Sequence, residues 1–162
     1  MLAFLIFIEG LVMCFFLLIT LVIGIANGPI GMVVMYEKNV QERVINLGLT
    51  TKSKMKKSFI ISLLVLYLPV LFFIPCMVYF INGACSFLDL FWQTTTISLI
   101  MGLFDRFFID WYWVGKTKAW EIPGTIDLKP YIPKKALIQK WFGTLVVLPA
   151  MAAISALLFS IL

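Results

Sequence analysis

The chain has 162 residues, of which 62% are hydrophobic and only 13% are charged, and its mean hydropathy is +1.05. A water-soluble domain averages about half apolar and about a quarter charged residues, and one of this size could not bury so much apolar surface. The composition therefore excludes an ordinary soluble fold and indicates a single membrane domain. The net charge of +5 is typical of the basic loops of a small membrane protein, so we expect no binding to nucleic acid.

Four apolar stretches run through the chain, each of about 20 residues, the length that crosses a hydrocarbon core about 30 Å thick. They cover residues 2–25, 59–81, 88–109 and 141–162. Because backbone amides inside lipid must be satisfied within their own segment, each stretch is predicted to be an α-helix. The first lacks the basic start and the cleavage site of a secretory signal. The sequence therefore predicts an all-α bundle of four membrane-spanning helices.

The basic residues indicate the orientation of these helices. All thirteen lie between the first and second stretches, at the end of the third stretch, or between the third stretch and the fourth. With four spans these two regions share one side, and the positive-inside rule makes it the cytoplasm. We therefore expect both termini outside, cytoplasmic segments at 37–57 and 111–140, and a location in the cell membrane of a bacterium.

The first cytoplasmic segment carries a short amphipathic pattern. Val40, Val44 and Leu47 recur at i, i+4 and i+7, which predicts an interfacial helix that Gly48 ends. We expect its apolar face to lie among the lipid headgroups, with its basic residues near anionic lipid. In the second segment, tryptophan and tyrosine side chains including Trp120 and Tyr131 suit the membrane–water boundary.

The third span has the clearest polar face. At about 100° per residue, one arc of about 120° holds small, hydroxyl and charged side chains: Thr94, Thr95, Ser98, Gly102, Asp105 and Arg106. The opposite side holds large apolar side chains: Ile97, Ile100, Phe104, Phe107 and Phe108. We expect the polar arc to face the bundle interior and the apolar side to face lipid.

Asp105 is the first candidate for a functional residue, because ionisable side chains at such depth are rare. One interpretation is structural: Arg106 pairs with Asp110 on the helix surface, and Asp105 meets a basic group from a loop. The other makes Asp105 a catalytic acid–base group or metal ligand and Arg106 an anion clamp. Asp105 and Asp110 lie about 140° apart on an α-helix, which is poor geometry for a shared Mg²⁺. The candidate ligand-binding residues are Asp105, Arg106, Asp110, Glu121, Thr95 and Ser98.

Glu9 is a second candidate, because it lies inside the first span with no basic residue on its side of the membrane. It is interpreted as a proton or cation site, unless the N-terminus frays or the amino terminus and water reach the carboxyl group. The chain has no histidine, which removes the commonest metal ligand. The three cysteines have no metal-ligand spacing. We expect no metal and no cofactor.

Three hypotheses for function remain open. The first is a non-catalytic membrane component, a small oligomer or accessory subunit that binds a lipid or a partner protein at its cytoplasmic rim. The second is a membrane-embedded enzyme that acts on a lipid or amphipathic substrate through Asp105 and Arg106. The third is a proton-coupled carrier or channel that uses Glu9. The lack of a nucleophile–base pair and of a cofactor motif favours the first, with membrane lipids, a second copy or another membrane subunit as partners.

Overall fold

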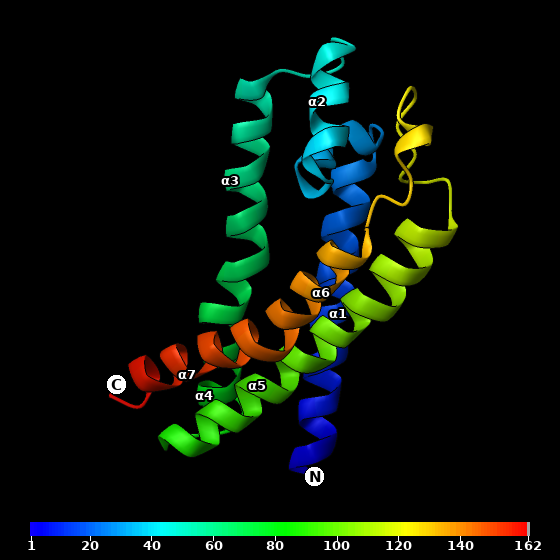
Figure 1. Ribbon diagram of the computed structural model, residues 1–162. Coiled ribbons are helices and arrows are strands. Elements are labelled where there is room, and N and C mark those ends of the chain that lie inside the picture. The colour runs from blue at the N-terminus through cyan, green and yellow to red at the C-terminus, as the bar shows by residue number, and fades with distance from the viewer. Residues whose placement is uncertain (162) are drawn as a thin grey trace.

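The computed structural model describes residues 1–161, and every regular element in that range is a helix. Four helical stretches are long and apolar enough to cross a membrane, and Figure 1 shows them running between the two ends of the molecule. They are Leu2–Ile25, Lys52–Phe80, Phe87–Val114 and Lys134–Phe159. The predictions of an all-α fold and of four apolar helices of spanning length are confirmed.

Three of these long helices contain a π-helical segment. The first is the regular helix α1 (Leu2–Ile25). The second is α3 (Lys52–Leu68), the π segment η2 (Pro69–Phe73) and α4 (Ile74–Phe80). The third is α5 (Phe87–Phe104) and the π segment η3 (Asp105–Val114). The fourth is α6 (Lys134–Phe142), the π segment η5 (Gly143–Val147) and α7 (Leu148–Phe159). The second and fourth begin before their apolar stretches, at Lys52 and Lys134, because lysine continues a helix nearly as readily as leucine. The third ends at Val114, beyond the end of its apolar stretch.

Proline accounts for two of the π segments. Pro75 and Pro149 have no backbone N–H, so neither can bond to the carbonyl group four residues earlier. The helix widens by one turn of i→i+5 bonding just before each of them, in η2 and in η5. Such a turn shifts the angular position of all side chains that follow it.

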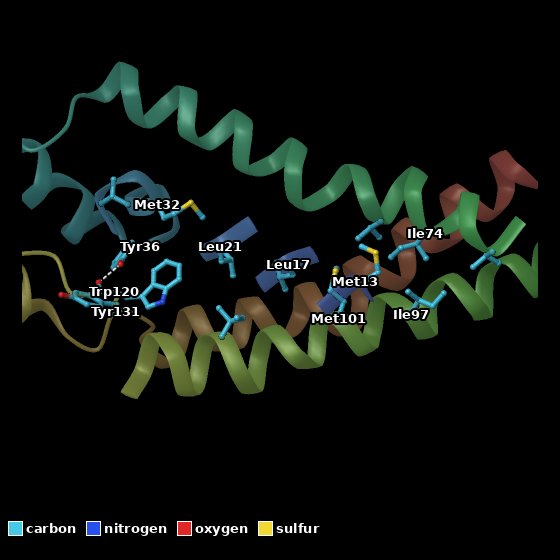
Figure 2. Close-up of a cluster of buried hydrophobic side chains, with 14 of the residues drawn as sticks. Met13, Leu17, Leu21, Met32, Tyr36, Ile74, Ile97, Met101, Trp120 and Tyr131 are labelled. Carbon is cyan, nitrogen blue, oxygen red and sulfur yellow. Dashed lines mark hydrogen bonds between the residues drawn. The ribbon is translucent and has the colours of Figure 1, made fainter. Parts of the chain in front are cut away.

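The helix α5 lies at the centre and packs most extensively against α7 and α1. A Cβ atom at Gly102 would lie 2.7 Å from Thr144 Cγ2, and one at Gly10 would lie 2.7 Å from Ile100 Cδ1, so both glycines permit close approach of two helices. Figure 2 shows the apolar core along this contact. Its members include Met13, Leu17, Leu21, Ile74, Ile97 and Met101.

The prediction that Ile97 and Ile100 face lipid is wrong. Ile97 is fully buried, and Ile100 packs on α1 beside Gly10. The physical reason is that α5 is covered by neighbours on two sides, so its buried face is wider than the polar arc. Phe107 and Phe108, further along the same predicted face, are exposed as predicted.

The helix α3 stands apart from the other long helices (Figure 1). Only Ser62 is buried along it. Beyond Pro69 the same long helix turns back to α5 and α7, and Val70, Ile74 and Val78 are fully buried there. The second half of this long helix, η2 and α4, therefore packs against the other long helices, whereas the first half, α3, does not.

The two basic loops fold together into one structure, which we call the cap (residues 29–50 and 115–133). It contains the 3-10 helix η1 (Pro29–Met35), α2 (Lys38–Asn46) and the 3-10 turn η4 (Ile126–Leu128). The Tyr36 hydroxyl donates a 2.6 Å hydrogen bond to the Trp120 carbonyl oxygen, which joins the two loops. Burial in this core raises the pKa of the Tyr36 hydroxyl, so it stays protonated and can donate this bond throughout the physiological pH range.

The expectation that the apolar face of α2 lies among lipid headgroups is wrong. The helix is present and Gly48 ends it with a positive φ of 70°, but Val40 and Val44 are fully buried inside the cap. Trp120 and Tyr131, expected at the membrane–water boundary, are also buried there. The apolar stripe of α2 and the aromatic side chains of the second loop were expected to contact the membrane. In the structure these two apolar surfaces cover each other inside the cap.

Candidate functional site

A cavity of about 470 Å³ lies between α3, η3, α6 and η5, next to the cap. The cavity exists because α3, the first half of the second long helix, stands away from the other long helices. Its volume lies within the range of about 300–1,000 Å³ that is typical of small-molecule sites. The apolar part of the lining comes from four of the long helices and includes Leu17, Leu21, Leu66, Met101, Val147 and Leu148.

Four charged side chains of the lining lie next to one another, and we call them the ionic cluster: Asp105, Arg106, Asp110 and Lys140. Arg106 forms ion pairs with its neighbour Asp105 and with Asp110, the latter at 2.5 Å between Nη1 and Oδ2. The other Asp110 oxygen accepts a 2.7 Å hydrogen bond from Lys140 Nζ. The Asp110 and Arg106 side chains are only 3% and 7% exposed, so each buried charge is compensated by its partner.

The π-helical backbone of η3 explains how two aspartates meet the same arginine. In a π-helix the backbone bonds join residues i and i+5, so side chains five positions apart lie nearly above one another. Asp105 and Asp110 have this spacing. The separation of about 140° holds only for an α-helix, and it is therefore wrong for these two residues.

The predicted pair of Arg106 and Asp110 is confirmed, but its place is not the helix surface, because both side chains are buried. The prediction that Asp105 meets a basic group from a loop is wrong. Asp105 contacts Arg106, and the additional cation is Lys140 of α6, which binds Asp110. Lys140 was not predicted as a site residue, because nothing in the sequence indicated that it contacts Asp110.

The cap closes one end of the cavity. It contributes the carboxylate of Glu37 and the indole of Trp120 to the lining. Trp120 Nε1 and Arg106 Nε are both buried, and neither has a hydrogen-bond partner among residues 1–161. Buried donors without partners are uncommon, but both atoms are covered by protein and do not open onto the cavity.

The remaining predicted site residues lie elsewhere. Thr95 and Ser98 are further along α5 and do not line the cavity. Glu121 forms an ion pair with Lys129 within the cap. Glu9 lies in α1 and is 5% exposed. The alternative of a frayed start at Glu9 is wrong, because α1 is helical from Leu2.

Residues 1–161 contain no group of three or more histidine, cysteine, aspartate or glutamate side chains that could hold a metal ion. No protein-family model, curated protein or solved structure matches this chain. The function is therefore argued from the geometry of the chain itself.

Proposed function

We propose that the chain is a multi-pass protein of the cell membrane that binds a phospholipid in the cavity and does not transform it. The observation that carries this proposal is the division of the cavity into an ionic end beside the cap and apolar walls away from it. A membrane phospholipid has the same division between a charged head and apolar chains.

The distribution of charge supports the orientation that goes with this function. Both loops of the cap are basic, and they lie at the same end of the molecule (Figure 1). The positive-inside rule then assigns the cap to the cytoplasm and both termini to the outer side. In this orientation the ionic end of the cavity lies at the depth of the cytoplasmic headgroups. Basic protein segments attract anionic lipids in that leaflet.

The ionic cluster has the chemistry to hold a phosphate group. An ammonium group has three N–H donors, and Asp110 accepts only one hydrogen bond from Lys140. These donors suit phosphate oxygens, and the weakly packed α3 leaves an apolar side on which acyl chains can lie.

The ion pairs favour binding over catalysis. A catalytic carboxylate must contact its substrate, whereas Asp105 already contacts Arg106. The enzyme hypothesis, the carrier hypothesis and the expected homo-oligomer or partner subunit stay predictions.

Filling the cavity tests the proposal. Ala136 lines the cavity on α6, so Ala136→Phe should block it without changing any charge. Ile138→Phe is the matched control, because Ile138 lies on the same helix and is 69% exposed. Melting temperature is measured in detergent with added phosphatidylglycerol, phosphatidylethanolamine or diacylglycerol.

We expect both phospholipids to raise the melting temperature of the parent and of Ile138→Phe. Diacylglycerol, which has no phosphate, should have no such effect. Ala136→Phe should fold but should not respond to any of the three. An equal response of both variants to phosphatidylglycerol would show that the lipid does not occupy this cavity.

A further inference from the structure

A second buried polar cluster lies at the end of the molecule opposite the cap. Glu9 of α1, Asn82 of the turn after α4 and Gln93 of α5 meet there. Asn82 Nδ2 donates to Glu9 Oε2 at 3.0 Å and to Gln93 Oε1 at 2.9 Å. Glu9 and Gln93 are only 5% and 3% exposed, so three separate elements bring polar side chains into an apolar interior.

The charge of Glu9 has no counter-charge from a lysine or arginine. The residues of this end of the molecule fall within 1–37, 58–105 and 141–162, and no basic side chain occurs in these ranges. The amino group of Met1 is about 12 Å away along the helix. The other acidic residue at this end, Asp89, is exposed. Its carboxylate accepts a hydrogen bond from the Ser86 hydroxyl, whose oxygen accepts one from the Asp89 backbone N–H. A buried carboxylate without a cation is strongly unfavourable.

The cluster also has oxygen atoms that lack partners. Glu9 Oε1 and Asn82 Oδ1 are both buried without a hydrogen-bond donor among residues 1–161. Rotating the Asn82 amide by 180° would exchange its oxygen and nitrogen atoms, which lie in nearly equivalent positions. Oδ1 would then face Glu9 Oε2 and Gln93 Oε1, and a set of oxygen atoms from three side chains would surround one point.

We propose that Glu9, Asn82 and Gln93 form a binding site for one monovalent alkali cation. Oxygen ligands select hard cations. A single carboxylate with two neutral amides carries one negative charge, which a monovalent ion balances. Divalent ions in proteins are usually held by more carboxylates or by several waters. The site is separate from the cavity and does not depend on lipid binding.

The first test compares cations at equal ionic strength and at fixed pH. The purified protein is melted in detergent with sodium chloride, potassium chloride or N-methyl-D-glucamine chloride, the last cation being too large for the site. Sodium or potassium should raise the melting temperature of the parent by several degrees in a saturable way. Glu9→Gln should abolish this response and should melt at least as high as the parent in N-methyl-D-glucamine. Asp89→Asn, the control at the same end, should respond like the parent.

The second test does not depend on the folding of Glu9→Gln. Equilibrium dialysis of the parent with radioactive sodium should give stoichiometric binding, and Asn82→Ala, which keeps the carboxylate, should weaken it several-fold. The proposal is overturned if the parent binds no sodium and shows no response to either alkali cation. It is also overturned if Glu9→Gln responds like the parent. Stabilisation that follows pH but not the cation would assign a proton to Glu9 in place of a metal ion.

Discussion

Asp110 is the residue on which the ionic cluster depends most. One of its oxygen atoms faces Arg106 and the other accepts a bond from Lys140. The sequence indicated the first of these contacts, because residues four apart are neighbours on a helix. It gave no indication of the second, because Lys140 lies 30 residues further along the chain and only the packing of α6 on η3 brings it close.

Replacing Asp110 should therefore cost much more than replacing a surface carboxylate. Among residues 1–161, Asp110→Asn leaves Arg106 with Asp105 as its only carboxylate partner and leaves Lys140 with none. Breaking a buried ion pair costs about 3–5 kcal/mol of unfolding free energy. Asp127→Asn breaks an exposed pair with Arg43, which is worth about 0–1 kcal/mol. Scanning fluorimetry in detergent should show a large fall in melting temperature for the first variant only. Equal falls would contradict the assignment of Asp110 as the centre of the cluster.

At the scale of the helix, the regularity of the backbone limits what a sequence pattern can predict. The polar arc of the third span correctly included the buried Ser98 and Gly102. It failed for Ile97, because two neighbouring helices cover α5, and for the spacing of Asp105 and Asp110, because η3 is π-helical. An angular projection assumes one uniform period and one buried side, and α5 with η3 has neither.

The close contact of α5 with η5 should be sensitive to a single methyl group. Gly102→Ala would place a Cβ atom 2.7 Å from Thr144 Cγ2, and such overpacking costs about 1–3 kcal/mol. Gly143→Ala is the control: its Cβ would meet nothing within 4 Å, and alanine favours a helix by about 1 kcal/mol over glycine. Thermal unfolding in detergent should show Gly102→Ala below the parent and Gly143→Ala at or above it. The reverse order would show that the two helices do not meet at Gly102.

At the scale of the whole molecule, the basic segments were the most informative part of the sequence. Their one-sided distribution predicted that the two loops lie together, and the cap joins them through Tyr36 and Trp120. The distribution of basic residues could not predict what covers the apolar face of α2. An apolar stripe such as Val40 and Val44 is compatible with lipid or with protein, and only the fold of the second loop decides between them.

The orientation can be tested by labelling in intact cells. Cys85 is exposed in the turn after α4, so it should react with a membrane-impermeant maleimide. Lys54 at the start of α3 and Lys118 in the cap are also exposed, but they lie at the cap end of the molecule. In the proposed orientation this end faces the cytoplasm, so Lys54→Cys and Lys118→Cys should react only after the cells are permeabilised. Reaction of Lys118→Cys but not Lys54→Cys in intact cells would refute the crossing of the membrane by all four helices.

The division of the cap between two loops has a consequence for biogenesis. Its halves are separated in the chain by the second and third long helices. If both helices cross the membrane as proposed, the halves can meet only after the two helices have entered it in opposite directions. A chain that inserts one of them wrongly leaves the halves on different sides, with Val40, Val44 and Ile122 uncovered in water in place of their fully buried positions. Assembly of the cap thus distinguishes correctly inserted chains from the others, whose exposed apolar side chains mark them for chaperones and proteases.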